Sequence, residues 1–264
     1  MHTDLSPDST VPIDTYAALA LEHGIAEIAI TDHVDFEPGA PAFGYTTFED
    51  RERIVRDAAD RWGPQGVEIR FGVELTYDRA WESDIRDHLA RYDYDFTIGS
   101  VHDRVESPYH PRNVGAWVAG RSLAESVQPS FTEVEAAARS GLFDAIGHID
   151  GVKRYLYPHV TPADFEAAPE LYEPILHALV ATGTALEVNT SGLRYAIKAA
   201  FPHPAIVARF REMGGRAVTV GSDAHRAEHA NWGLADGYDI ITTAGFDVLT
   251  FRRAPSTPSV QIPV

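Results

Sequence analysis

Short apolar runs rich in β-forming residues alternate with amphipathic stretches along this sequence, and this alternation constrains the fold more than any other feature. The runs predict strands at residues 26–31, 67–75, 96–101, 143–149, 185–189 and 217–221. The intervening stretches predict helices, as at 48–62, where Ile54, Ala58 and Trp62 share one face, and at 169–183 and 203–215, which end at glycine. Six strands alternating with helices are typical of βα units with a mainly parallel sheet.

A barrel explains this pattern better than an open doubly wound sheet. No G-x-G-x-x-G motif follows the first predicted strand, and chemically reactive residues follow nearly every strand instead of gathering at one switch point. The 264 residues contain no low-complexity tract, linker or internal repeat. We therefore expect one domain, residues 1–264, folded as a closed or nearly closed α/β barrel.

The charge balance disfavours partners that carry phosphate backbones or anionic headgroups. The chain has 22 Lys and Arg against 39 Asp and Glu, a net charge of −17 with neutral histidines. No apolar run is long enough to span a membrane, and the N-terminal segment is polar and acidic, unlike a secretory leader. These features predict a cytoplasmic protein that acts on a small molecule, without a membrane or nucleic-acid partner. They do not predict its oligomeric state.

Possible metal ligands follow five of the six predicted strands, and two more lie in the N-terminal segment. The set is His2, Asp8, His33, Glu74, His102, His148, Asp223 and His225. Any one of these histidines alone would more often be structural, so the prediction depends on their joint placement. Because the carboxyl ends of barrel strands converge on one face, we expect these groups to meet around the axis. Imidazoles and carboxylates beside an apolar interior need a strong partner, and divalent cations suit them.

Eight ligands exceed what one tetrahedral ion needs, which predicts two or three divalent ions with Glu74 as a bridging carboxylate. The chain has no cysteine, so all ligands are nitrogen or oxygen, a set compatible with zinc, manganese or iron. A water shared by two ions about 3.5–4 Å apart would lose its proton near neutral pH and attack a phosphoryl or carbonyl centre. Such hydrolysis needs no protein nucleophile.

The same residues resemble the motifs of the PHP (polymerase and histidinol phosphatase) family. The chain shows HTDLSPD (2–8), TDH (31–33), GVE (72–74), GSVH (99–102), IGH (146–148) and SDAH (222–225), in the family's order and over essentially its full length. The resemblance implies a distorted (β/α)7 TIM-like barrel with a trinuclear metal site. The three ligand sets that it implies are His2, Glu74 and Asp223; Glu74, His102 and His148; and Asp8, His33 and His225.

One departure from the family pattern lies at the N-terminus. The family's first element has two histidines, and His2 matches the second of them. The strand that leads into this element is also missing, so only six of seven strands are visible. We expect that the chain as given starts too late by a short segment and that the first metal site is weakened as a result. Upstream DNA without a strand-like run ending in histidine would contradict this expectation.

Within the family, HIDGVKRY (148–155), LEVNTSGLR (186–194) and the single-domain length resemble the histidinol-phosphatase branch. Lys153, Arg154 and Arg194 follow predicted strands, so we expect them at the rim of the site, where guanidinium groups bind phosphate oxygens in pairs. The alternative to a phosphate contact is that these cations lie at a solvated helix start or form an ion pair with a nearby acid. This alternative is strongest for Lys153. Asn189 is expected to position phosphate, to support a ligand or to form a turn.

The leading hypothesis is a metal-dependent phosphomonoesterase that converts L-histidinol phosphate to histidinol and inorganic phosphate. Glu74 would bridge ions, Arg154 and Arg194 would hold the phosphoryl oxygens, and Asp223 or His225 would protonate the leaving alkoxide.

Three alternatives remain open at this point. One is a PHP phosphoesterase for a nucleotide or cyclic phosphate, with specificity set by loops such as 36–48 and 105–120. Another is a nucleic-acid exonuclease or accessory module, against which the net charge counts. The last is an inactive domain that binds metal.

Overall fold

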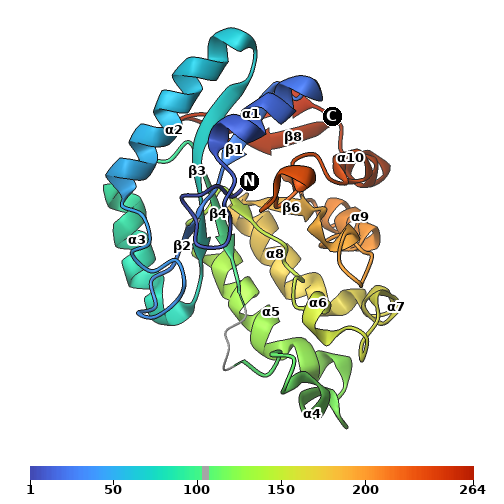
Figure 1. Cartoon of the computed structure of the whole chain (residues 1–264). Helices are drawn as coiled ribbons and strands as arrows, with labels where there is room; N and C mark the ends of the chain where they lie inside the picture. Colours follow the sequence, from blue (N-terminus) through green and yellow to red (C-terminus); the bar gives the residue numbers. More distant parts are fainter. Residues whose placement is uncertain (103–106) are drawn as a thin grey trace.

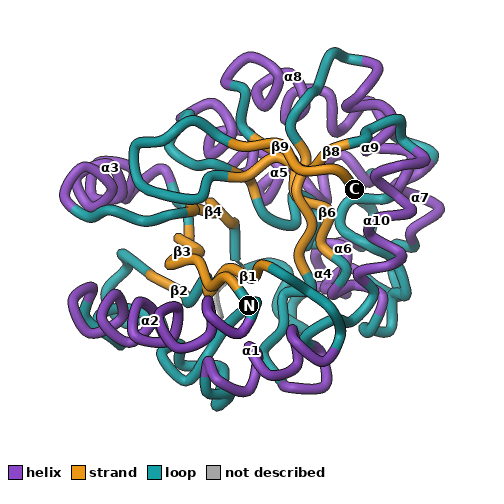
Figure 2. Tube along the Cα trace, turned by 90° about the horizontal axis from the view of Figure 1, so that it is seen from above, coloured by secondary structure: helices purple, strands orange, loops and turns teal. Residues whose placement is uncertain are grey.

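The computed structural model describes residues 1–102 and 107–264. Its centre is a parallel sheet in the order β1-β3-β4-β5-β6-β7, with β2 paired to the carboxyl half of β3. The strands are β1 Glu27–Ile30, β2 His33–Val34, β3 Glu68–Thr76, β4 Phe96–Ser100, β5 Ala145–Ile146, β6 Ala185–Asn189 and β7 Val218–Gly221. Figure 2 shows these strands as a curved inner layer with helices around the outside.

Helices connect the strands and cover the outer face of the sheet (Figure 1). They are α1 Ile13–Glu22, α2 Phe48–Trp62, α3 Glu82–Arg91, α4 Val114–Val118, α5 Leu123–Ser140, α6 Lys153–Leu156, α7 Pro162–Glu166, α8 Glu173–Thr182, α9 Pro204–Glu212 and α10 Leu234–Thr243. Short 3-10 turns are η1 Gly63–Gln65, η2 Arg79–Trp81, η3 Pro169–Tyr172, η4 Ser191–Leu193 and η5 Ala227–His229. In the described residues, no helix has both the length and the apolar character needed to cross a bilayer.

All six strands predicted from the sequence are confirmed, although 143–149 is reduced to the two residues of β5. The helix predicted at 48–62 is also confirmed, and Thr47 caps it by accepting a hydrogen bond from the Asp50 amide. A hairpin of β8 (Val248–Phe251) and β9 (Val260–Pro263) was not predicted. Leu249 and Thr250 of β8 are buried, whereas β9 alternates between half-buried and exposed residues.

The parallel sheet curls into a half-barrel, in keeping with the α/β barrel expected from the sequence, and a full (β/α)7 closure is not seen among the described residues. Strands β1 and β7 are its two edges, and the described residues show no pairing between them. The N-terminal segment lies between these edges instead. The Thr31 amide donates to the Met1 carbonyl at 2.9 Å on one side, and the His2 amide donates to the Ala224 carbonyl at 2.9 Å on the other.

One hydrophobic cluster extends from Leu5 to Leu249 and packs the helices on the sheet. At the amino end of the strands an ion pair ties α2 to this core, because Arg56 donates to Asp95 at 2.5 and 2.8 Å. Asp95 also accepts the Phe71 amide at 2.9 Å. The carboxyl end of the sheet has polar side chains in place of this apolar packing, and these form the candidate site.

Candidate metal centre and pocket

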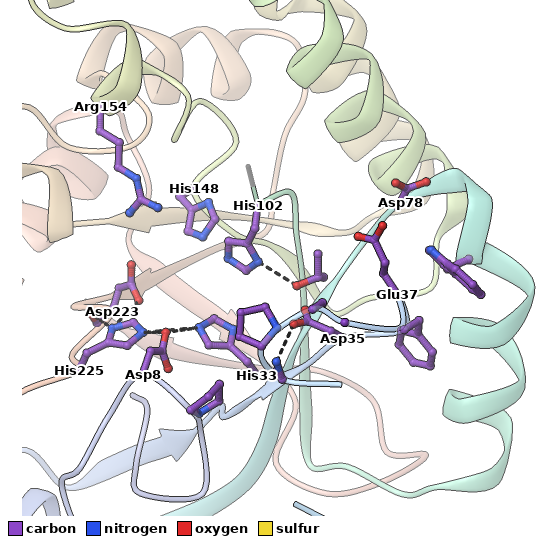
Figure 3. A pocket seen from close by; sticks show the side chains of 18 of the residues that line it. Asp8, His33, Asp35, Glu37, Asp78, His102, His148, Arg154, Asp223 and His225 are labelled. Carbon is purple, nitrogen blue, oxygen red and sulfur yellow. Dashed lines mark hydrogen bonds and ion pairs between the residues drawn. The ribbon is translucent and has the colours of Figure 1, made fainter. Parts of the chain in front are cut away.

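Eight residues that the sequence places far apart converge at the carboxyl end of the half-barrel. Figure 3 shows Asp8, His33, His102, His148, Asp223 and His225 among them. Their positions follow from the strands: β2 and β3 carry one residue each, four follow β4, β5 and β7, and two belong to the N-terminal segment. His33 lies on β2 and Glu74 on β3. His102 follows β4, His148 follows β5, and Asp223 and His225 follow β7, whereas His2 and Asp8 belong to the N-terminal segment. Parallel strands deliver their final residues to one edge, which is why the eight meet.

The Glu74 carboxylate lies at the centre, and its two oxygens face different partners. Oε1 is 3.1 Å from His102 Nε2 and 3.2 Å from His148 Nε2. Oε2 is 3.2 Å from His2 Nε2, which is also 3.3 Å from Asp223 Oδ1. Only 4% of Glu74 is exposed, so both oxygens are committed to these neighbours.

A second group of side chains forms around Asp8. Its Oδ2 is 3.3 Å from His33 Nε2 and 3.1 Å from His225 Nε2, and these two nitrogens are 3.5 Å apart. His225 Nδ1 is 3.5 Å from Asp223 Oδ1, so Asp223 links this group to the one around Glu74.

These residues fit divalent metal ions. Tetrahedral ligands at zinc distances lie about 3.3 Å from one another, and the separations between candidate ligand atoms here are 3.1 to 3.5 Å. In His2, Glu74 and Asp223 one ligand atom each lies within 4.8 Å of the others. Five imidazoles with three carboxylates form a nitrogen and oxygen donor set that suits such ions. Thr76 supports it, because its hydroxyl is 2.9 Å from His102 Nδ1 and leaves Nε2 directed at Glu74.

A pocket of about 980 Å³ opens over this cluster. Arg154 and Arg194 line it, and Figure 3 shows Asp35, Glu37 and Asp78 on the side opposite Arg154. Loop 36–48 therefore contributes to the pocket through residues 36–42, as the sequence suggested. For loop 105–120, residues 105 and 106 lie outside the described residues, and its described part contributes no lining residue.

Arg154 is the cation best placed to meet an anion bound over the cluster. Its guanidinium lies between two tyrosine rings, 4.5 Å from the centre of the Tyr155 ring and 5.5 Å from that of Tyr195. It donates to the Tyr155 hydroxyl and, at 3.5 Å, to that of Tyr195. Arg194 is held differently, since it donates to the carbonyls of Ser222 and Asp223 at 2.6 and 2.5 Å. It therefore supports the backbone of a candidate ligand as well as lining the pocket.

Comparison with known proteins decides the family. Residues 1–191 match the family model described as the PHP domain. The chain belongs to the PHP family. Among curated relatives, a probable histidinol-phosphatase of Deinococcus radiodurans is 30% identical over 98% of this chain and 97% of its own length. The histidinol-phosphatase of Lactococcus lactis subsp. lactis is 25% identical over 94% of this chain and 91% of its own length.

A solved structure has the same fold as this PHP protein. It is histidinol phosphate phosphatase from Lactococcus lactis, crystallised with zinc, L-histidinol and phosphate. The TM-score is 0.81 at 23% identity, with 96% of this chain and 95% of that chain covered. The likeness establishes the PHP fold for nearly the whole chain.

Charge coupling in the PHP site shifts several pKa values. Burial opposes protonation of His148, but its hydrogen bond to Glu74 together with the negative charges of Glu74, Asp223 and Glu187 raises the pKa of His148 to about 9. Burial likewise opposes protonation of His33, but the hydrogen bond to Asp8 together with the negative charges of Glu74, Asp8 and Asp223 raises the pKa of His33 to about 9. Against the effect of burial, contacts with His225 and His33 lower the pKa of Asp8, and contacts with His102, His148 and His2 lower that of Glu74. The metal-free site thus holds protons at neutral pH where a cation would fit.

We expect metal binding at pH 7 to release protons. His33 and His148, with pKa values of about 9, are protonated below that pH and must lose their protons to bind an ion. The affinity should therefore rise with pH up to about 9 and then level off. Calorimetric titration of the metal-free protein with zinc in two phosphate-free buffers of different ionisation enthalpy would measure the release. Equal heats in both buffers at pH 7 would contradict it.

Sequence reasoning missed Glu187, a buried acid on β6 directly behind the cluster. Its Oε2 accepts the His148 amide at 2.9 Å and so fixes a residue whose φ is +24°. Burial raises the pKa of Glu187 to about 7. Glycines make the space for it, because a Cβ on Gly221 would lie 2.3 Å from its Oε1. The signal available in the sequence was a charged residue within the otherwise apolar start of the predicted strand at 185–189.

Asn189, expected to position phosphate, to support a ligand or to form a turn, contacts Glu187 and the backbone after β6. Its Nδ2 donates to Glu187 at 3.1 Å, and its Oδ1 accepts the Ser191 amide at 3.0 Å. The side chain is buried in the interior below the cluster and does not line the open pocket.

Lys153 corrects the expectation of a substrate contact. Its side chain is 0% exposed, and its ammonium is 2.7 Å from Asp150 Oδ2. The ion-pair alternative therefore holds here. The lysine lies one position before Arg154 on α6, and this short helix points the two side chains to different sides.

Proposed function

We propose that this chain is a metal-dependent phosphomonoesterase that hydrolyses L-histidinol phosphate to histidinol and inorganic phosphate. The observation that carries the proposal is the Glu74 carboxylate, whose oxygens face separate histidine groups beneath a pocket lined by two arginines. The relatives named histidinol-phosphatase, one of them 30% identical over nearly the whole chain, support this substrate. The zinc, L-histidinol and phosphate in the Lactococcus lactis structure support the same reaction.

The residues proposed to hold metal form three sets that share Glu74 between the first two. They are His2, Glu74 and Asp223; Glu74, His102 and His148; and Asp8, His33 and His225. The proposed ions are zinc, manganese or iron, since the donors are imidazole nitrogens and carboxylate oxygens. When bound, two or three such ions supply an acidified water and neutralise charge on the phosphoryl group.

The chain's own residues then bind and orient the substrate. Arg154 is proposed to donate to phosphoryl oxygens from the pocket rim, and Arg194 to line the same side while it holds the Asp223 carbonyl. Asp223 or His225 is proposed to give a proton to the leaving alkoxide, since both line the pocket beside the cluster.

For the architecture, we propose a distorted (β/α)7 barrel formed by residues 1–264 as one domain. Residues 1–2 would take the seventh position, because they hydrogen-bond to Thr31 beyond β1 and to Ala224 beyond β7. The main hydrophobic cluster, which extends from Leu5 to Leu249, supports the single domain.

Phosphate release from a panel of phosphomonoesters tests the function. The purified protein would first be analysed for bound metal and then assayed with histidinol phosphate, mononucleotides and cyclic phosphates. We expect histidinol phosphate to give the highest kcat/KM by a wide margin. Preference for a nucleotide would redirect the proposal to another phosphoesterase, and a salt-sensitive gel shift with single-stranded DNA would favour the nuclease reading. Metal binding without hydrolysis of any ester would favour an inactive domain.

A further inference from the structure

A fully buried ion pair lies just behind the arginine side of the pocket. Lys153 and Asp150 are both 0% exposed, and Lys153 Nζ is 2.7 Å from Asp150 Oδ2. The Tyr172 hydroxyl donates to the same carboxylate oxygen at 2.6 Å. Neither charged group reaches solvent or the pocket, so the site chemistry described above does not use them.

The lysine ammonium also contacts a distant part of the chain. It donates to the Ala200 carbonyl at 3.1 Å. Its Nζ lies 5.3 Å from the centre of the Phe201 ring and 5.8 Å from that of Phe165. The next residue, Phe201, pairs with Asn189 at the end of β6, with amide-to-carbonyl distances of 2.8 and 2.9 Å in the two directions. The ammonium thus joins the segment after β5 to the end of the loop after β6.

Each of the two joined segments carries one residue of a contact at the pocket, the contact between Arg154 and Tyr195. The segment after β5 carries Arg154, next to Lys153 in the chain. The loop after β6 carries Tyr195, whose hydroxyl is 3.5 Å from the Arg154 guanidinium. This loop is tightly closed, since a Cβ on Gly192 would lie 1.9 Å from the Ala199 carbonyl oxygen. A shift at Ala200 would therefore be transmitted to Tyr195.

The chemistry of the pair favours a positional role over a purely stabilising one. In a buried ion pair, the attraction between the two charges offsets the free-energy cost of removing them from water. Well-packed apolar residues of the same volume often stabilise a fold equally or more. Here the carboxylate and the ammonium make directional contacts to three separate elements, η3, α6 and the loop before α9. Apolar side chains would fill this space without fixing those directions.

We propose that the Lys153–Asp150 pair is a positioning device that holds Arg154 against Tyr195 and so sets the pocket's affinity for the phosphoryl group. The inference rests on the proposed function only in that the pocket takes a phosphate. It assigns Lys153 and Asp150 no contact with substrate.

The test is a double variant, Lys153→Met with Asp150→Asn, in the metal-loaded protein. Both replacements keep the shape of the side chains, and the amide oxygen at position 150 can still accept the Tyr172 hydroxyl. Calorimetry with inorganic phosphate should show a dissociation constant raised about tenfold, the scale of a small misplacement of a binding group. The bound metal per chain should stay unchanged, and KM should rise by a larger factor than kcat falls.

The matched control removes a different ion pair at the opposite end of the strands. Arg56→Met with Asp95→Asn loses a pair with distances of 2.5 and 2.8 Å that ties α2 to the core, far from the pocket. It should lower the unfolding temperature and leave the phosphate dissociation constant unchanged. If the double variant at 150 and 153 fails to fold, Tyr172→Phe replaces it, because it removes only the hydroxyl that fixes Asp150. We expect a smaller rise of the dissociation constant in the same direction.

Two results would overturn the inference. One is a folded variant of the pair, or Tyr172→Phe in its place, that binds phosphate as tightly as the unsubstituted protein. The other is an equal loss of phosphate affinity in the Arg56 and Asp95 control, which would assign the effect to stability. Failure of the proposed function looks different, because the unsubstituted protein would then bind phosphate but release none from histidinol phosphate.

Discussion

Glu74→Gln should lower kcat by at least about 10³-fold and reduce the metal bound per chain, because this side chain serves both histidine groups of the centre. Oε1 faces His102 and His148, whereas Oε2 faces His2, so a bridging role needs two equivalent anionic oxygens. The glutamine amide offers one neutral oxygen and one NH2 group. The NH2 group can neither accept a hydrogen bond nor bind a cation. Elemental analysis and phosphate release would measure the two effects.

The fold should survive this substitution. Glu74 lies at the carboxyl end of β3, and the apolar residues of the same strand, Phe71, Val73 and Leu75, form the packing. Glu68→Gln is the matched control, since this acid lies at the amino end of β3 and is largely exposed. It should leave both metal content and turnover unchanged. Full activity of the metal-loaded Glu74→Gln protein would remove the bridging role.

Arg154→Met should lower kcat/KM by about 10²-fold while the metal content stays the same. The guanidinium is held by Tyr155 and Tyr195 and is aimed into the pocket over the cluster, where it can form paired hydrogen bonds to phosphoryl oxygens. Methionine keeps much of the length and the apolar contacts with the two rings but has no donor. Inorganic phosphate should also inhibit this variant more weakly.

The control for charge alone is Arg53→Met on α2, where 61% of the side chain is exposed. It changes the net charge equally and should leave kcat/KM unchanged. An unaltered kcat/KM in Arg154→Met would dismiss the phosphate contact and return the role to Arg194, whose guanidinium is already engaged by two backbone carbonyls. The inhibition constant of phosphate would then be the same in both proteins.

Six of the eight candidate ligands could be predicted from the strands, because each lies at the end of a predicted strand or shortly after it, whereas His2 and Asp8 lie in the N-terminal segment. A polar residue such as His102 or His148 directly after an apolar run marks the point where a buried strand reaches the surface of the sheet. Parallel strands bring all such points to one edge, so convergence follows from the alternation of strands and helices alone. The sequence therefore indicated the family and the candidate ligands.

The supporting residues could not be predicted in the same way. Lys153 and Arg154 are adjacent cations in the same motif, and only the direction of α6 decides that one is buried with Asp150 and the other lines the pocket. Glu187 lies within an apolar strand, and its role depends on space left by Gly221 on a neighbouring strand. Neither relation is local in the sequence.

The sequence by itself determined the parallel α/β architecture and the ligand-bearing strand ends, because hydrophobic period and strand direction are encoded locally. Only the tertiary structure decided that the sheet curls into a half-barrel with residues 1–2 between its edges, and which cations face the pocket. Those features depend on contacts between residues such as Lys153 and Ala200, 47 positions apart, and such contacts form only when the elements pack.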